Sequence, residues 1–283
     1  MNIGIVGLGL IGGSLGLDLR DLGHQVLGVS RQSQTCAAAI ARGVVDQASS
    51  DLALLAAAEV IFICTPLAVM QSTVEALLPH LQATAILTDV GSVKAPIVQA
   101  IRLLWPNFIG GHPMAGTTET GIAAAQPHLF VGRPYVLTPI ETTPVAVIDT
   151  VTKLVRSLQC QVYQCSPEAH DRAVAWISHL PVLTSASLIA ACLSEPDATV
   201  LQLAQQLASS GFRDTSRVGG GNPELGRMMA QYNRAELLRS LQAYRRSLDQ
   251  LITQVEQENW LELEQQFIRT RQARLKFLKP LDI

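Results

Sequence analysis

The sequence predicts an α/β doubly wound domain over residues 1–165, followed by an all-α domain over residues 166–283. In the first part, short apolar runs of strand length alternate with helical segments, which is typical of a mostly parallel sheet covered by helices. After Ser166 the strand signals end and helical periodicity takes over. With 48% hydrophobic and 16% charged residues, the chain can bury a core in each domain.

Seven apolar runs of the first domain have the length and composition of strands buried on both faces of a sheet. Helical segments lie between several of them. Two of these segments are followed by Gly23 and Gly43, and glycine readily supplies the left-handed conformation that ends a helix. The expected strands are Ile3–Val6, Val26–Val29, Val60–Cys64, Ala85–Thr88, Phe108–Gly110, Tyr135–Leu137 and Val162–Gln164, and the expected helices are Ser14–Leu22, Ser33–Arg42 and Leu67–Leu78.

The second domain begins with an expected helix start, where Ser166 is the N-cap, Pro167 takes the first helical position and Glu168 lies in the first turn. Farther along, apolar residues recur at steps of four and three, which predicts a long helix packed through one face. This face packs within the domain or against a second subunit, and we expect a homodimer. Its residues are Leu237, Leu241, Tyr244, Leu248, Leu251 and Val255.

The segment Ala173–Leu193 contains no Asp, Glu, Lys or Arg. It is long enough to cross a bilayer, which takes about 20 apolar residues. However, it carries His179, Pro181 and several hydroxyl side chains. We therefore expect a helix buried in the protein core, and no association with a membrane.

Charge and cysteine content exclude several classes of protein. The net charge of −2 and pI of about 6.3 give no reason to expect nucleic acid or an anionic membrane as a partner. The five cysteines form no CxxC pair, so neither a disulfide framework nor a zinc site is expected. Met1 leads directly into a strand without a preceding basic segment, which predicts no signal peptide and a cytoplasmic protein.

A glycine-rich loop follows the first expected strand and opens a helix. In such a loop Gly7 permits the tight turn, Gly9 lets the backbone approach a pyrophosphate, and Gly12 lets the helix lie close to the strand. The phosphates then meet the positive end of the helix, near Leu10 and Ile11. Because the motif stands in a βαβ unit, it predicts a Rossmann-type dinucleotide-binding domain.

The second strand ends at Val29 and is followed by Ser30 and Arg31. An NAD site usually has an acidic residue at this place, bonded to the ribose 2′-hydroxyl. Here a serine can donate to a 2′-phosphate and an arginine can pair with it, so we expect NADP. Thr65 and Pro66 follow another strand, and they should line the cofactor cleft because ligands bind outside the carboxyl ends of such strands.

Two further segments end strands at the same edge of the sheet. Asp89–Lys94 (DVGSVK) opens a helix, and Gly110–Gly116 (GGHPMAG) follows the next strand. We therefore expect Ser92 and His112 to meet beside the cofactor.

Five segments spread over both domains resemble, in order and spacing, the prephenate/arogenate dehydrogenase family, the TyrA proteins. They are GLGLIGGS, DVGSVK, GGHPMAG, HDR…SHLP and GFRDTSR. The resemblance implies oxidation of a ring hydroxyl by hydride transfer to the nicotinamide, followed by loss of CO2 and aromatisation. It also implies that the second domain is a helical substrate and dimerisation domain. The chemistry needs no metal.

By this resemblance His112 accepts the hydroxyl proton, since histidine has a pKa near neutrality. Ser92 hydrogen-bonds the hydroxyl or orients His112. His179 lies on the substrate side. Arg217 binds a substrate carboxylate through its guanidinium group, as does Arg213 unless it pairs with Asp214.

Many relatives that use prephenate have a second histidine after SHLP, where this chain has Val182. This difference, with the NADP signal, favours arogenate, and prephenate is the alternative. β-Hydroxyacid dehydrogenases and pyrroline carboxylate reductases share the domain organisation. The former rely on a lysine of the second domain, and residues 166–275 contain none; the latter lack GGHPMAG. A non-enzymatic NADP sensor that signals through its dimer is a third alternative.

Overall fold

The computed structural model describes residues 1–117 and 119–278. Its first domain contains one sheet of eight strands in the order β3-β2-β1-β4-β5-β6-β7-β8. All neighbouring strands are parallel except β6 and β7, which are antiparallel. The strands are β1 (Asn2–Val6), β2 (Gln25–Val29), β3 (Gln47–Ser49), β4 (Val60–Ile63), β5 (Ile86–Asp89), β6 (Phe108–Pro113), β7 (Pro134–Thr138) and β8 (Gln161–Gln164).

Helices cover both faces of this sheet. One apolar cluster joins strand residues such as Ile61 and Ile63 to α3 (Leu67–Leu77) and α4 (Ala95–Ile101). A second cluster joins Val60 and Phe62, the alternate residues of β4, to α1 (Leu10–Asp21), α2 (Ser33–Ala41) and α5 (Val145–Ser157). Successive side chains of a strand point to opposite faces, so a continuous apolar run serves both clusters. The doubly wound architecture expected from the sequence is thereby confirmed.

The seven strands expected from the sequence are all present, with ends that differ by a few residues. Gly23 and Gly43 have φ angles of 81° and 67°, as expected for left-handed helix ends. The strand β3 was not expected, because its three residues carry no apolar run. The first helix starts at Leu10 rather than at Ser14, directly after the glycine turn.

The second domain is helical throughout the residues that the structure describes. Ser166 caps α6, and its Oγ accepts a hydrogen bond from the Ala169 N–H at 3.1 Å. The long segments are α6 (Pro167–Val174), the π-helix η4 (Ala175–His179), α7 (Leu180–Leu193), α8 (Ala198–Leu207), α9 (Ser210–Ser216), α10 (Pro223–Tyr232), α11 (Arg234–Glu256) and α12 (Trp260–Phe277). The short 3-10 helix η5 (Arg217–Gly220) also lies in this domain, whereas η1 (Leu52–Ala57), η2 (Leu78–His80) and η3 (Ile122–Ala124) lie in the sheet domain.

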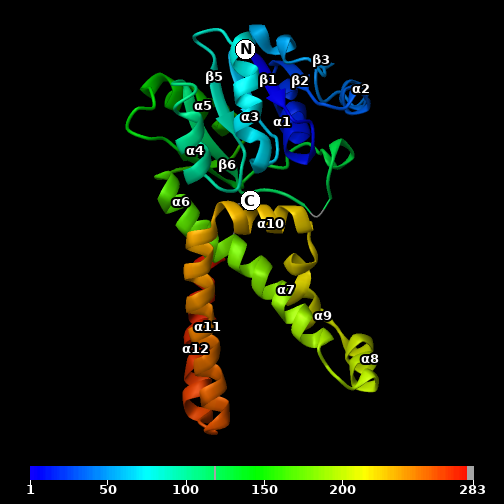
Figure 1. The fold of residues 1–283 in the computed structure, drawn as a ribbon, viewed down its shortest axis with the longest axis vertical. Helices are drawn as coiled ribbons and strands as arrows, with labels where there is room; N and C mark the ends of the chain where they lie inside the picture. Colours follow the sequence, from blue (N-terminus) through cyan, green and yellow to red (C-terminus); the bar gives the residue numbers. More distant parts are fainter. Residues whose placement is uncertain (118, 279–283) are drawn as a thin grey trace.

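The helical domain has two arms below the sheet domain (Figure 1). One arm is the hairpin of α11 and α12, and the other contains α7, α8 and α9. The helix α10 runs beneath the sheet domain, and its Met228 belongs to the same apolar cluster as α3. The two domains therefore share a close interface near the carboxyl edge of the sheet.

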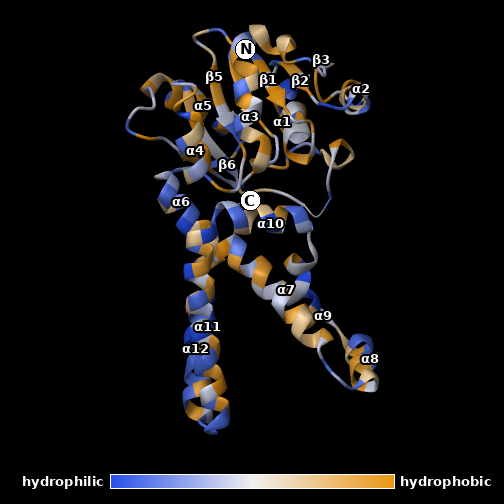
Figure 2. Cartoon of the chain, in the orientation of Figure 1, coloured by the Kyte–Doolittle hydropathy of each residue, from blue (hydrophilic) through white to orange (hydrophobic). Residues whose placement is uncertain are grey.

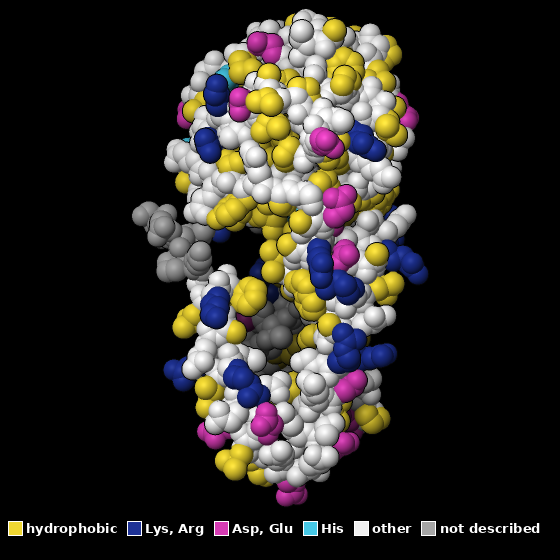
Figure 3. Space-filling model, turned by 90° about the vertical axis from the view of Figure 1, so that its left-hand side faces the viewer, with side chains coloured by type: hydrophobic (Ala, Val, Ile, Leu, Met, Phe, Trp, Pro, Cys, Tyr) yellow, Lys and Arg dark blue, Asp and Glu magenta, His cyan; other side chains and the backbone are white. Residues whose placement is uncertain are grey.

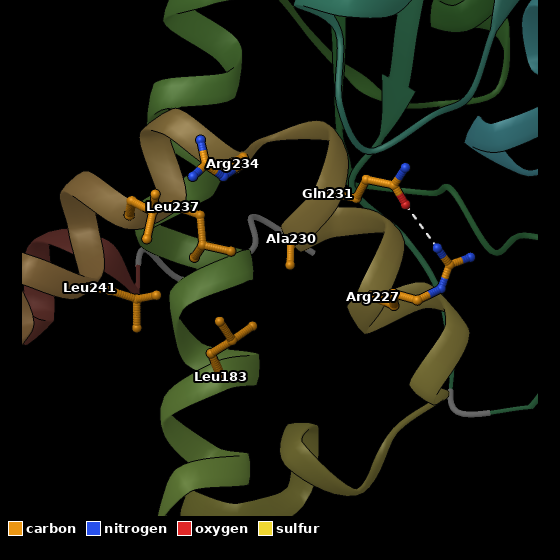
Figure 4. A pocket seen from close by; sticks show the side chains of 8 residues that line it. Leu183, Arg227, Ala230, Gln231, Arg234, Leu237 and Leu241 are labelled. Atoms are coloured by element: carbon orange, nitrogen blue, oxygen red, sulfur yellow. Dashed lines mark hydrogen bonds between the residues drawn. The ribbon is translucent and has the colours of Figure 1, made fainter.

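Much of the apolar surface of the helical domain is exposed in the single chain. Hydrophobic residues recur along both arms (Figure 2), and the space-filling view shows them beside Lys and Arg side chains (Figure 3). A groove between α7, α10 and α11 is lined by leucines together with Ala230 and the polar residues Arg227, Gln231 and Arg234; the leucines include Leu183, Leu237 and Leu241 (Figure 4). The apolar face expected on α11 is exposed at Tyr244, Leu248 and Val255.

The stretch Pro167–Leu193 is long and apolar enough to cross a bilayer by length and composition. Only 17% of its most apolar window is buried, so the expectation of a helix buried in the core is wrong for the single chain. The physical reason is its position, because α7 forms an outer arm and only part of its surface contacts the rest of the chain.

Candidate active site

The glycine-rich loop forms a tight turn between β1 and α1. Gly7 has a φ of 100°, which L side chains rarely adopt, and a Cβ there would lie 2.6 Å from the Cys64 carbonyl oxygen. A Cβ on Gly12 would collide with the Gly7 carbonyl oxygen, so only glycine lets α1 start this close to the strand. Around Gly9 a Cβ would meet nothing within 4 Å. The outer side of the turn is therefore open.

These residues fit a dinucleotide. Gly9 is the N-cap of α1 and offers no side chain, and the first turn of the helix contains no acidic residue. Its positive end is thus left for an anion at Gly9, Leu10 and Ile11. Across the turn, the Thr65 Oγ1 is buried without a hydrogen-bond partner among the described residues, next to Pro66 at the start of α3. This hydroxyl is able to bond a ligand atom at this place.

The residues that follow β2, Ser30 and Arg31, lie at the other end of the expected dinucleotide site. The backbone of Ser30 is already bonded, since its N–H donates to the Ser49 carbonyl at 3.2 Å and its carbonyl accepts from the Cys36 thiol at 3.5 Å. The Ser30 hydroxyl makes no hydrogen bond among the described residues, and Arg31 is exposed beside it.

The segment after β6 folds back over α1. The Ser14 Oγ accepts from the Gln126 N–H at 3.1 Å, and the Asp18 Oδ1 accepts from the His128 N–H at 2.8 Å. Arg42 of the loop after α2 donates to the Ala125 carbonyl at 2.8 Å. The chain that leaves His112 is therefore fastened to the helix that carries the glycine loop.

A buried ion pair holds β6 beside the end of β5. The Lys94 Nζ donates to the Asp89 carboxylate and, at 2.7 Å, to the Gly111 carbonyl. The Asp89 Oδ1 accepts from the Gly111 N–H at 3.1 Å. Both charged side chains are fully buried. They fix the backbone of the residue immediately before His112.

His112 lies on β6 and is buried, with its ring tied to the helical domain. Its Nδ1 is 2.8 Å from the His170 Nε2, and the His170 Nδ1 is 2.8 Å from the Asp171 Oδ1. The Asp171 oxygens also accept from the N–H groups of Lys94 at 2.7 Å and Ala95 at 2.8 Å. Three residues thus form a hydrogen-bonded chain from the reactive edge of the sheet to the start of α4.

Burial lowers the pKa of His112 well below its usual 6.5, and the nearby His170, Lys94 and His179 lower it further. A neutral imidazole is consequently favoured at neutral pH. Such a group can accept a proton from a hydroxyl.

His179 ends the π-helix η4 and is fully buried. Pro181, two residues on, has no N–H to donate, which favours the widened turn. Burial lowers the pKa of His179 to about 4, partly opposed by Asp171 and the Ser92 backbone. The Asn233 Nδ2 donates to its Nδ1 at 3.1 Å and to the Asp171 carbonyl at 2.8 Å. The ring is therefore neutral and held by the junction of α10 and α11.

Ser92 and His112, which the sequence places together, are both close to His179. Ser92 lies beside His179, and His179 is near enough to His112 to influence its pKa. The Nδ1 of His112 is occupied by His170, so the ring is oriented from that side by a histidine rather than by Ser92.

The two arginines lie elsewhere on the helical domain. Arg213 is exposed and pairs with the Asp214 Oδ1 at 3.3 Å, the alternative considered for it from the sequence. Arg217 begins η5 and is exposed. This short helix packs against α7, where Gly219 lies close to Ser185. The preceding helix α9 is bonded to α7 through the Ser185 Oγ, which donates to the Thr215 carbonyl at 2.6 Å. No hydrogen bond or ion pair joins Arg217 to His112 among the described residues.

Sequence reasoning gave no role to His170, Asp171 or Asn233. A signal for the first two existed in the helix that starts at Pro167. The buried residues of α6 are Pro167, His170, Asp171 and Val174, which follow the three- and four-residue spacing of one helix face. A histidine and an aspartate on a buried face need polar partners, and a buried active site supplies them.

A glycine turn at the start of α1 and a buried neutral histidine on β6 of the same sheet are features expected of a nicotinamide-dependent dehydrogenase. Residues 15–164 match the sequence model of the prephenate dehydrogenase nucleotide-binding domain, and residues 166–269 match that of the prephenate dehydrogenase dimerization domain. The chain belongs to the prephenate/arogenate dehydrogenase family.

Relatives of known sequence agree. The chain is 31% identical to prephenate dehydrogenase of Bacillus subtilis over 262 residues, which cover 90% of this chain and 70% of that protein. It is 28% identical to cyclohexadienyl dehydrogenase of Zymomonas mobilis, covering 100% of this chain and 98% of that one.

Solved structures extend the likeness to the whole fold. A crystal structure of Synechocystis arogenate dehydrogenase is 55% identical, with a TM-score of 0.88, and covers 98% of this chain and 100% of that chain. Prephenate dehydrogenase of Aquifex aeolicus, in complex with hydroxyphenyl propionate and NAD+, is 25% identical with a TM-score of 0.92, covering 98% of both chains.

Proposed function

We propose that the protein oxidatively decarboxylates arogenate to tyrosine with NADP+ as the hydride acceptor. The observation that carries this proposal is the 55% identity to Synechocystis arogenate dehydrogenase over essentially the full length of both chains. Val182 supports it, because it lies three residues after His179 on the same helical face, where many users of prephenate carry a histidine.

The preference for NADP+ rests on Ser30 and Arg31. No acidic residue stands at the end of β2 to hydrogen-bond a ribose 2′-hydroxyl. The serine hydroxyl and the exposed guanidinium group can both donate to a 2′-phosphate, and the guanidinium can stack on the adenine. Gly7, Gly9, Leu10, Ile11 and Gly12 hold the pyrophosphate, with Thr65 and Pro66 across the cleft.

When bound, NADP+ supplies the hydride acceptor of the reaction. His112 accepts the ring hydroxyl proton while the carbinol carbon loses its hydride, which gives a ring ketone. The bond to the ring carboxylate then breaks and CO2 leaves. Its electron pair completes the aromatic ring, and the ketone oxygen takes up a proton to become the phenol. His112 can return that proton.

The remaining residues hold the substrate. Ser92 hydrogen-bonds the reacting hydroxyl, and His179 lies beside it on the substrate side. Arg217 binds a carboxylate through its guanidinium group. Arg213 is the weaker candidate, because it already pairs with Asp214.

Prephenate is the alternative substrate, with 4-hydroxyphenylpyruvate as its product. It is favoured by the name of the Bacillus subtilis relative at 31% identity. The two substrates differ only in their side chain, which is an amino acid in arogenate and a keto acid in prephenate.

We further propose that the protein acts as a cytoplasmic homodimer through its helical domain, without nucleic acid or membrane partners. The exposed apolar faces of α7 and α11 need a cover, and the matching domain model is described as a dimerization domain. A membrane is the poorer cover for Pro167–Leu193, because its His170 and Asp171 hydrogen-bond into the sheet domain.

The direct test follows reduced nicotinamide by absorbance with purified protein, combining arogenate or prephenate with NADP+ or NAD+. The expected result is turnover chiefly with arogenate and NADP+. Turnover chiefly with prephenate would overturn the reading of Val182, and equal use of NAD+ would overturn that of Ser30 and Arg31. Cofactor binding without any turnover would favour a sensor.

A further inference from the structure

We propose that His170 is a positioning residue, which forces the proton of neutral His112 onto Nδ1 and leaves Nε2 as the proton-accepting atom. This inference rests on the proposed function of His112 as the base. It extends that function to a residue of the other domain, because His112 belongs to β6 and His170 to α6.

The argument starts at Asp171. Its Oδ1 accepts from the Lys94 N–H at 2.7 Å and its Oδ2 accepts from the Ala95 N–H at 2.8 Å. Backbone N–H groups can only donate, so both carboxylate oxygens act as acceptors. The His170 Nδ1, at 2.8 Å from Oδ1, must then be a donor and carry a proton.

The proton on Nδ1 fixes the rest of the His170 ring. A neutral imidazole carries a single proton, and in His170 the contact with Asp171 places it on Nδ1. The Nε2 of His170 is then an acceptor. Its partner, the His112 Nδ1 at 2.8 Å, can only donate.

His112 therefore keeps a lone pair on Nε2. No hydrogen bond to this atom occurs among the described residues, so it remains available to a substrate hydroxyl. If His170 were absent, either ring nitrogen of His112 could hold the proton, and only one of the two forms would be a base at Nε2.

Two substitutions separate positioning from bulk structure. The amide of Gln reaches the place of the imidazole Nε2, whereas the shorter amide of Asn reaches the place of Nδ1. His170→Gln can therefore still accept from the His112 Nδ1–H through its carbonyl oxygen. His170→Asn keeps the contact with Asp171 and loses the one with His112. Both are uncharged amides that do not titrate.

The first measurement is steady-state kinetics with arogenate and NADP+. His170→Gln is expected to keep kcat within about 10-fold of the unchanged protein, as a rescued positioning contact should. His170→Asn is expected to lose more, up to the roughly 10²–10⁴-fold that a positioned base contributes. The KM values should change little in both. Equal kcat for the two variants would overturn the proposal.

The second measurement is ¹⁵N NMR of histidine-labelled protein without substrate at pH 8, which reports the protonated ring nitrogen of His112. The expected result is a proton on Nδ1 in the unchanged protein and a mixture of the two forms in His170→Asn. A proton on Nε2 in the unchanged protein would overturn the inference. His128→Asn is the matched control, since His128 is 69% exposed in its side chain and lies outside this chain of contacts.

The two readouts distinguish the failure of each proposal. If neither arogenate nor prephenate is turned over but NMR gives the expected forms, the proposed function fails and the role of His170 stands. If turnover is observed and the His112 proton is on Nε2, the function stands and the role of His170 fails.

Discussion

Asp171, in the first helix of the helical domain, accepts a hydrogen bond from the backbone N–H of Lys94 at 2.7 Å. The same carboxylate accepts from the Ala95 N–H, so Asp171 caps the N-terminus of α4 in the other domain. Through His170 it also reaches His112. Asp171 therefore has two roles: it holds the two domains together, and through His170 it orients the proposed base.

Replacing Asp171 with Ala is expected to destabilise the protein by at least about 1–3 kcal/mol, because it leaves buried backbone N–H groups and His170 without an acceptor. Urea unfolding followed by circular dichroism measures the change. Asp214→Ala is the matched control, because this aspartate is 73% exposed and, among the described residues, forms an ion pair with exposed Arg213 alone. Its expected effect is within about 0.5 kcal/mol. Equal losses in the two variants would contradict the role of Asp171.

His112→Asn is expected to lower kcat by about 10²–10⁴-fold, because the reaction loses its proposed proton acceptor. NADP+ binding, measured by fluorescence titration, should remain, since His112 lies outside the glycine cradle. Retained turnover in this variant would assign the base to another residue.

The acidic limb of kcat/KM is expected to have its midpoint below pH 6.5. Burial lowers the pKa of His112 well below that value, so the ring stays neutral, and able to accept a proton, at pH values where a free histidine is already charged. A pH–rate profile measured with saturating NADP+ checks this. A midpoint above pH 6.5 would show that the His112 environment favours the charged ring.

The stability of the protein should also decrease towards acidic pH. With the pKa of His179 at about 4 in the folded protein and 6.5 as its ordinary value, the unfolded chain binds more protons between these limits. The free energy of unfolding is therefore expected to fall as the pH drops from 6.5 towards 4, and His179→Gln should reduce this slope. Urea unfolding across this range, compared between the two proteins, measures it.

Gly9→Ala and Gly12→Ala should fail in different ways. A Cβ at Gly12 collides with the Gly7 carbonyl oxygen, so this variant should lose about 1–3 kcal/mol of stability or more. A Cβ at Gly9 meets nothing within 4 Å, so the variant should fold normally and bind NADP+ more weakly. Thermal unfolding with and without NADP+ separates the two effects. Undiminished NADP+ affinity in Gly9→Ala would place the pyrophosphate elsewhere.

Arg31→Ala should raise the KM for NADP+ by about 10- to 150-fold, which corresponds to about 1.5–3 kcal/mol for a hydrogen bond to a charged group. NAD+ has no 2′-phosphate, so its KM in the same variant is the internal control. Equal changes for both cofactors would mean that Arg31 does not contact the phosphate.

The sheet domain could be predicted well because its signals are local. Apolar runs gave the strands, and Gly7, Gly23 and Gly43 marked turns that need positive φ angles. The edge strand β3 escaped because its three residues, Gln47–Ser49, pair only with β2 and bury little apolar surface. Such a strand has no apolar pattern from which it could be predicted.

The site was harder, because it is assembled from positions far apart in the chain. His112 could be found from its motif, and the side chain that orients it could not, since His170 is 58 residues away and bonds to it across the domain boundary. The expectation that Ala173–Leu193 is buried in the core is wrong for a related reason. Hydrophobicity predicts that a surface is covered, but it does not say whether the same chain supplies the cover.

The three apolar clusters of the sheet domain have a consequence for the order of assembly during synthesis. Apart from Met228, all their buried members come from the first 158 residues. Domains tend to fold in turn as they leave the ribosome, so this half can form while the helical arms are still being made. A nascent chain would then hold its dinucleotide before α6 docks and supplies His170. We therefore expect a newly made chain to bind the dinucleotide before it can turn over substrate. Turnover should begin only when the second domain has docked on the first.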